Sequence, residues 1–240
     1  MIELQNGQLS SMDFKATIPP CDNEMEISVF GQGFGECIAI CCGHRNYVII
    51  DSFVNRKTGK PIALEYLSSM GLPPSCIKQV VITHWHKDHI EGAAEILKEA
   101  SPDVEVVLNP IVKNDKFNKL IERGAAEKNE SVSEFEKIYD FISCNGYKNV
   151  IVSTCRSKIY SNHGTGEVEL FSLSPQDNEI FKYISSLNIP KESQQVSYVY
   201  PSDNLLSIVL LARIANKGFL FGGDMENSLS EDSGWPAIVS

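Results

Sequence analysis

The sequence predicts a layered α/β fold, and two observations support that prediction. Short apolar segments of strand length alternate with amphipathic segments of helical length along most of the chain. The residues best suited to chemistry also lie in a loop directly after one apolar segment, where a strand end holds side chains rigidly. No repeat, low-complexity tract or long linker divides the 240 residues, so we expect a single domain over residues 1–240.

The expected strands are short, apolar and bounded by Gly-rich or turn-like breaks. They cover residues 26–30, 36–42, 47–51, 77–83, 104–108, 150–153, 158–160, 166–173, 205–213 and 217–221, the last two as a hairpin. Helices are expected over residues 61–70, 90–100 and 175–187, the last with Pro175 in its first turn. Two further amphipathic segments, residues 113–123 and 131–144, predict a helical insertion around residues 111–146.

The composition limits which partners and which cellular location we expect for this protein. The chain has 21 Lys and Arg against 31 Asp and Glu, a net charge of -10 that weakens the case for nucleic-acid binding without excluding a local basic groove. The first residues lack a secretory signal, and the most apolar windows are too short to span a membrane. Seven cysteines, an odd number without a Cys-x-x-Cys pair, indicate reduced thiols. We therefore expect a cytoplasmic protein that makes no membrane contact.

A histidine-rich run after the expected strand at residues 77–83 predicts a metal site. His84, His86, Asp88 and His89 place three imidazoles and a carboxylate within six residues. Imidazole nitrogen and carboxylate oxygen suit Zn²⁺, and also Mn²⁺ or Fe²⁺. His84 and His86 alternate along an extended loop, while Asp88 and His89 reach a second position, so the spacing favours two ions over one. A His-rich surface loop is the weaker explanation, because the run holds three of the chain's five histidines.

The run His-x-His-x-Asp-His after a strand resembles the signature of the metallo-β-lactamase superfamily. Two other segments are similar to landmarks of that family: residues 47–51, ending in Asp51, and residues 219–226, containing Asp224. Residues 31–33, 173–175 and 203–210 most resemble the branch found in bacterial competence (DNA-uptake) channel proteins. The resemblance extends from about residue 27 to residue 226.

This resemblance implies an αββα sandwich and a metal-dependent hydrolase. It implies that His84 and His86 bind the first ion, that Asp88 and His89 bind the second, and that Asp224 bridges them, with Asp51 supporting the metal loop. The nucleophile would be a metal-bound hydroxide oriented by Asp88. The branch favours a phosphodiester substrate, either nucleic acid or a nucleotide. The alternatives are a thioester, lactam or lactone hydrolase, or a catalytically weak metal-binding sensor module of a larger assembly.

Several features depart from the family pattern. Asp203 and Asn204 stand where many members have a histidine; Asp203 is either an oxygen ligand that favours Mn²⁺ or part of an ordinary turn. No histidine follows Asp224, so we expect the C-terminal part of the fold to be incomplete. A longer native chain, of which this is the N-terminal fragment, or a partner subunit would then supply the missing part. His44 and His163 are expected in turns.

Two more groups of residues have a structural and a functional interpretation. Lys116, Lys119 and Arg123 share one face of the insertion, either as the solvated side of an amphipathic helix or as a phosphate-binding stripe. The acidic total favours the first. Trp85, between two expected ligands, is expected to pack beneath the loop rather than to stack on substrate.

Overall fold

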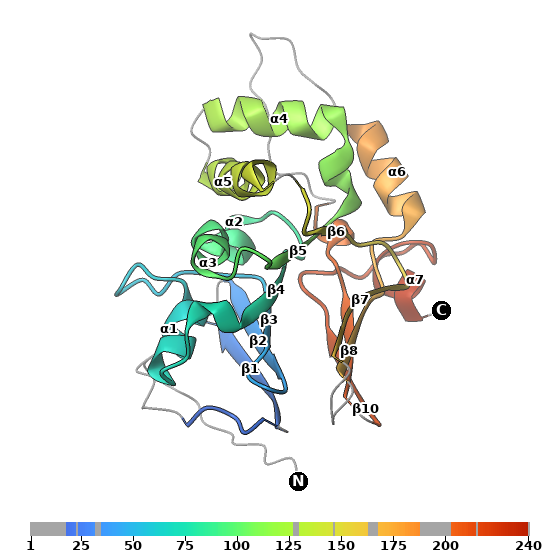
Figure 1. Ribbon diagram of the computed structural model, residues 1–240. Helices are drawn as coiled ribbons and strands as arrows, with labels where there is room; N and C mark the ends of the chain where they lie inside the picture. Colours follow the sequence, from blue (N-terminus) through green and yellow to red (C-terminus); the bar gives the residue numbers. More distant parts are fainter. Residues whose placement is uncertain are drawn as a thin grey trace.

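The computed structural model describes residues 18–22, 24–31, 35–126, 130–145, 147–162, 168–187, 203–214 and 216–239. In this part of the chain two β-sheets pack face to face, with helices on the outer side of the first sheet (Figure 1). This arrangement confirms the predicted α/β sandwich.

The first sheet has the strand order β1-β2-β3-β4-β5-β6. Its strands are β1 (Met25–Gly31), β2 (Glu36–Cys42), β3 (Tyr47–Ile50), β4 (Ile77–Val81), β5 (Glu105–Leu108) and β6 (Val150–Val152). Strands β1 to β3 pair antiparallel, whereas β3 to β6 are parallel. The carboxyl ends of four neighbouring strands therefore meet at one edge of the sheet, where loops can bring polar side chains together.

The second sheet is antiparallel, with the order β10-β9-β8-β7. Its strands are β7 (Ser157–Asn162), β8 (Val168–Ser172), β9 (Leu210–Ile214) and β10 (Lys217–Phe221). Alternate residues face the first sheet, and Ile40, Val48, Val81, Leu170 and Leu210 belong to the buried apolar layer between the two sheets. This layer fixes the two sheets relative to each other, so it also fixes the loops at their common edge.

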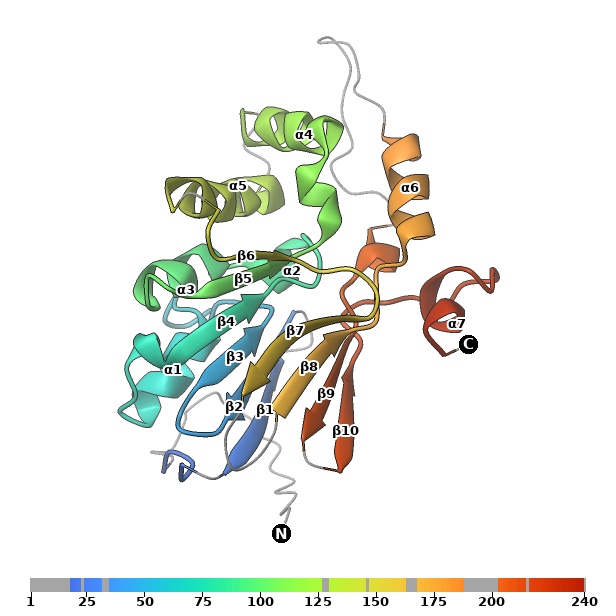
Figure 2. The same ribbon diagram turned by 45° about the vertical axis from the view of Figure 1, so that its right-hand side comes forward.

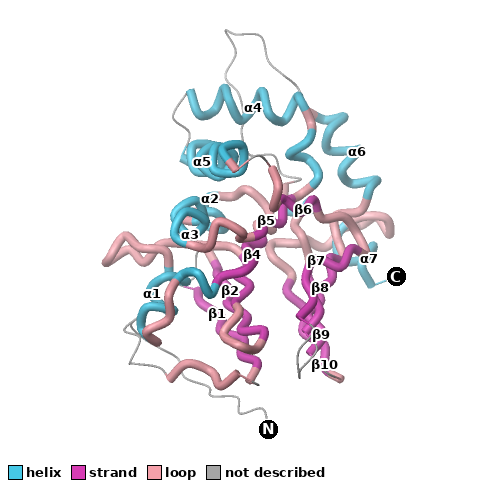
Figure 3. Tube along the Cα trace, in the orientation of Figure 1, coloured by secondary structure: helices cyan, strands magenta, loops and turns pink. Residues whose placement is uncertain are grey.

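Helices cover the other face of the first sheet (Figure 3). They are α1 (Ile62–Ser69), the short α2 (Lys87–Ile90) and α3 (Ala93–Glu99), while α5 (Glu130–Cys144) packs on α2 and α3, and α4 (Asp115–Ala126) packs on α5. Ile90, Phe117 and Ile138 join the larger core between these helices and the sheet. The turn η2 (Pro110–Lys113) with α4 and α5 is the predicted helical insertion, and Lys116 and Lys119 on α4 are exposed above the buried Phe117 and Leu120.

Helices α6 (Asp177–Ser186) and α7 (Gly234–Val239) lie near one end of the second sheet (Figure 2). Glu179 connects them, because its Oε1 accepts hydrogen bonds from Ser233 Oγ at 2.8 Å and from Gly234 N at 2.7 Å. No helix in the described ranges is long and apolar enough to cross a membrane. All seven cysteines are free thiols, and Cys37, Cys41 and Cys42 are buried.

Three expected elements differ from the structure. The helix expected over residues 90–100 begins only at Ala93, because Gly92 before it adopts φ of +84° and a Cβ there would lie 2.9 Å from Pro61. The strand expected from residue 205 begins only at Leu210, after the 3₁₀ turn η3 (Asn204–Leu206). Pro175 precedes α6 rather than opening it, and Gln176 caps the helix.

Candidate metal centre

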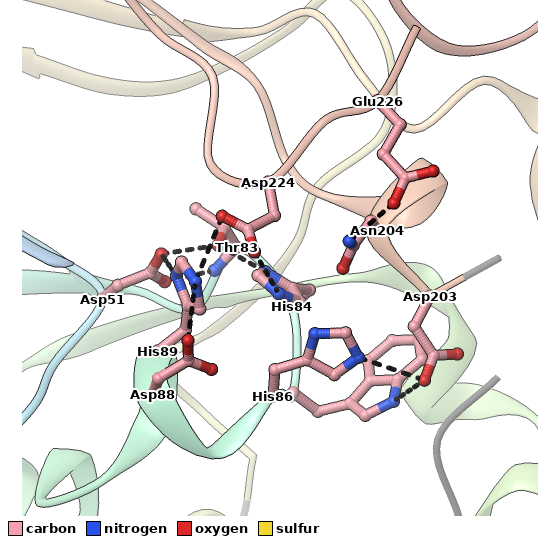
Figure 4. Close-up of polar contacts among 11 residues, drawn as sticks. Asp51, Thr83, His84, His86, Asp88, His89, Asp203, Asn204, Asp224 and Glu226 are labelled. Carbon is pink, nitrogen blue, oxygen red and sulfur yellow. Dashed lines mark hydrogen bonds and ion pairs between the residues drawn. The ribbon is translucent and has the colours of Figure 1, made fainter. Parts of the chain in front are cut away.

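The candidate metal centre lies at the edge where β3 and β4 end (Figure 4). The loop after β4 carries Thr83, His84 and His86, and α2 carries Asp88 and His89. His84 and His89 are only 1% and 2% exposed. Packing therefore holds these two imidazoles in place before any ion binds.

Asp51, the residue after β3, organises the loop. It is fully buried and adopts φ of +56°, a backbone conformation that non-glycine residues seldom adopt. Its carboxylate accepts hydrogen bonds from Thr83 N at 2.7 Å, from Thr83 Oγ1 at 2.6 Å and from His89 Nδ1 at 2.8 Å. Since Nδ1 of His89 donates to Asp51, its Nε2 faces the centre of the site, as in many histidine metal ligands.

Thr83 orients His84 in the same way. Its hydroxyl gives its hydrogen to Asp51, so it accepts from His84 Nδ1 at 3.0 Å. The remaining ring nitrogen, Nε2, then carries a lone pair, and it is buried without a hydrogen-bond partner. Burial, together with the nearby His89 and His86, lowers the pKa of His84 to about 2. His84 is thus a neutral imidazole with its lone pair free for a cation.

Asp224 comes from the other sheet, three residues after β10 ends. Its Oδ1 lies 3.2 Å from His89 Nε2, and its Oδ2 lies 3.9 Å from His84 Nε2. One carboxylate therefore faces two imidazoles. Asp88 lies on the solvent side, with 45% of its side chain exposed and Oδ2 4.0 Å from His89 Nε2.

The structure also brings Asp203 to the centre. This residue is fully buried, and its Oδ2 lies 3.4 Å from His86 Nε2. The same oxygen accepts a hydrogen bond from Trp85 Nε1 at 3.2 Å. The Trp85 ring packs on Phe117 and Tyr183, with centroids 4.9 Å and 5.6 Å away, which confirms that it packs beneath the loop. Asp203 therefore begins the turn η3, as one of the two alternatives expected, while its carboxylate belongs to a buried network with Trp85 and His86.

The donor set fits one or two divalent cations. Ligand atoms of His84, His86 and Asp224 all lie within 4.8 Å of one another, as do those of Asp51, His84 and His89. Ligands about 2.1 Å from a tetrahedral zinc ion are separated by about 3.4 Å, close to the contacts of Asp203 with His86 and of Asp224 with His89. Acceptor atoms that face one another repel, so such a group is stable only when a cation or a proton lies among them.

The charges around His89 favour its protonated form when no cation is bound. Burial alone would lower the pKa of His89. The hydrogen bond to Asp51 and the charges of Asp51, Asp224 and Asp88 outweigh burial and raise that pKa to about 9. The same negative charges act on Glu36 at the start of β2. Burial, and after it the charge of Asp51, raises the pKa of Glu36.

Sequence reasoning missed several residues of the site. The spacing of the histidine run predicted no role for Thr83 or for Glu36. Asn204 donates from Nδ2 to Glu226 Oε1 at 2.8 Å beside the centre, and no sequence signal indicated that pair. His44 lies in an exposed turn as predicted, whereas His163 is outside the described residues.

Residues 30–113 match the model of the metallo-beta-lactamase superfamily. A putative metallo-beta-lactamase from Thermotoga maritima has 17% identity and a TM-score of 0.40 over 64% of this chain and 74% of its own. Metallo-beta-lactamase SMB-1 has 12% identity and a TM-score of 0.39, over 65% of this chain and only 54% of its own. The short form of human tRNase Z has 11% identity and a TM-score of 0.42, over 86% and 71% of the two chains.

Proposed function

We propose that this protein is a metal-dependent hydrolase that cleaves a phosphodiester. One observation supports this above all: His84, His86 and His89 converge with Asp203 and Asp224, although more than a hundred residues separate the two groups in the chain. The Nε2 atoms of His84 and His86 are buried there without a hydrogen-bond partner among the described residues, which lowers stability unless a ligand compensates.

The contacts support a ligand assignment. The first position would take His84, His86 and Asp203, the second would take Asp88 and His89, and Asp224 would lie between them. Asp51 would orient His89 rather than bind a cation, because its carboxylate oxygens already accept hydrogen bonds from Thr83 and from His89 Nδ1. Zn²⁺ suits the three imidazoles, while the carboxylates keep Mn²⁺ and Fe²⁺ as alternatives.

The bound cations would supply a water of lowered pKa and would polarise the scissile phosphoryl group. Hydrolysis adds that water across one P–O ester bond, and the leaving oxygen takes a proton. Asp88 is placed to orient the water and to accept its proton, since nearly half of its side chain is exposed above His89.

The preference for a phosphodiester rests on the resemblance to competence-channel proteins, and the charge of the site supports it. The carboxylates of Asp51, Asp88, Asp203 and Asp224 would repel an anionic substrate from the metal-free site, whereas two divalent cations would offset these four charges. Nucleic acid and nucleotides share the required phosphodiester. The free thiols of all seven cysteines support a cytoplasmic location.

The first experiment measures metal content per chain and cleavage of bis(4-nitrophenyl) phosphate, on protein purified without chelators. We expect one to two equivalents of metal and turnover, both lost in His86→Ala. His44→Ala is the matched control, because His44 lies in an exposed turn away from the centre. Turnover that survives His86→Ala would refute the proposal.

A second experiment tests the substrate class. The same preparation is assayed on a phosphodiester, a thioester, a lactam and a lactone at equal concentration. We expect the highest kcat/KM on the phosphodiester. A larger kcat/KM on any of the other three, also lost in His86→Ala, would support a metal-dependent hydrolase but refute the phosphodiester as its substrate.

A further inference from the structure

Asn204, the first residue of η3, has an amide group whose orientation is set by its partner. Its Nδ2 donates to Glu226 Oε1 at 2.8 Å. A carboxylate only accepts hydrogen bonds, so the amide must present its NH₂ group to Glu226. The flipped amide would place two acceptor oxygens against each other. The carbonyl oxygen Oδ1 of Asn204 is therefore held on the side away from Glu226.

That oxygen is buried and has no hydrogen-bond partner among the described residues. A buried carbonyl oxygen costs stability unless a donor or a cation faces it. The Nε2 atoms of His84 and His86 are in the same condition. Figure 4 shows the oxygen of Asn204 on the side of these two imidazoles, with Glu226 on the other side.

Asn204 is tied to the centre through its chain neighbour and through its hydrogen-bond partner. Its predecessor, Asp203, lies 3.4 Å from His86 Nε2. Its hydrogen-bond partner, Glu226, is two residues after Asp224, which lies 3.9 Å from His84 Nε2. Both neighbours thus belong to the centre, Figure 4 shows the Asn204 oxygen on its imidazole side, and carbonyl oxygen is a suitable ligand for divalent cations.

We propose that Asn204 Oδ1 is an oxygen donor to the cation position formed by His84 and His86, and that Glu226 is the positioning residue that orients it. This inference rests on the proposed metal centre and adds two residues to it. Asp203 and Asn204 together then supply oxygen atoms on the side where the family pattern leads one to expect a histidine nitrogen.

The test is titration of the metal-free full chain with Co²⁺, followed by calorimetry and by the visible spectrum of the ion. Asn204→Leu removes the oxygen at similar size, and we expect the affinity of the first position to fall by at least about tenfold, with changed Co²⁺ bands. Asn149→Leu is the matched control. Asn149 also donates from Nδ2 to an oxygen, that of Pro102 at 3.1 Å, but it lies at the opposite end of β6.

Variants of Glu226 test the orienting role and do not require Asn204→Leu to fold. Glu226→Ala should weaken Co²⁺ binding several-fold and change the spectrum. Glu226→Gln should restore both, because its amide oxygen still accepts from Asn204. Equal Co²⁺ affinity of Glu226→Ala and the wild type would refute the positioning role of Glu226.

The outcomes separate this inference from the proposed function. If the wild type binds no Co²⁺, both are overturned. If His86→Ala loses Co²⁺ while Asn204→Leu keeps wild-type affinity and spectrum, the metal centre stands and the role of Asn204 is refuted.

Discussion

The two sides of the metal centre are built in different ways. The histidine side comes from one short segment after β4, and a single buried carboxylate, Asp51, holds it by hydrogen bonds to Thr83 and His89. The carboxylate side comes from two separate loops, at η3 and after β10. There Asp224 has 41% of its side chain exposed, and Glu226 is exposed as well.

This difference has a functional consequence. The histidine side is set by packing and by hydrogen bonds that exist without a cation, so it is preorganised. The carboxylate side brings like charges toward one another, and a bound cation would relieve that repulsion. We therefore expect changes on the carboxylate side to act mainly on metal binding, and changes on the histidine side to act on folding stability as well.

The largest effect is expected for Asp224→Asn, which alters a side chain that faces both His84 and His89. Metal content should fall to at most one equivalent. Turnover should fall by at least about 100-fold, since a bound cation contributes several kcal/mol to the transition state. Metal analysis and phosphodiester assays measure both. Asp232→Asn, on an exposed turn, is the control, and full activity of Asp224→Asn would contradict the bridging assignment.

Asp51→Asn should have the next largest effect. The neutral amide no longer accepts all the hydrogen bonds that orient Thr83 and His89, so metal affinity should fall by about 10–100-fold. The thermal midpoint of the metal-free protein should fall too, and by more than in Asp224→Asn, because Asp51 accepts three buried hydrogen bonds whereas the Asp224 side chain is 41% exposed. Calorimetry of both variants, with the exposed Asp103→Asn as control, tests this contrast between the two sides.

Trp85→Phe should have a smaller effect, because it keeps an aromatic ring and removes only the N–H that binds Asp203. Loss of a hydrogen bond to a charged group lowers the free energy of unfolding by about 1.5–3 kcal/mol. Denaturant titration measures this change. In an Asp203→Asn background the same substitution should cost less; an equal cost in both backgrounds would show that the two residues are not coupled.

The smallest effect concerns pH and the metal-free protein. His89, with a pKa of about 9, should contribute stability that is complete below about pH 6.5 and lost as the pH rises through 9. His84, with a pKa of about 2, remains neutral, so its contribution is lost as the pH falls below about 6.5. NMR titration of the imidazoles should show these opposite shifts. Normal titration of both near pH 6.5 would contradict the buried network.

Much of the fold was predictable because its signals are local. Apolar segments bounded by turns predicted the strands, and the amphipathic periodicity of residues 113–144 predicted α4 and α5 within a few residues. The break at Gly92 was missed because the close approach of Pro61, which excludes a side chain there, is a tertiary contact. The expected further C-terminal region or partner subunit stays a prediction.

The sequence by itself determined the histidine side of the centre, since His84, His86, Asp88 and His89 are neighbours in the chain and their spacing carries the chemistry. It did not determine which oxygen atoms face them. Only the packing of the two sheets brings Asp203, Asn204 and Asp224 to the same edge. The same packing places Glu226 where it orients the amide of Asn204. Such contacts depend on distances in space, and the spacing of residues along the chain does not encode them.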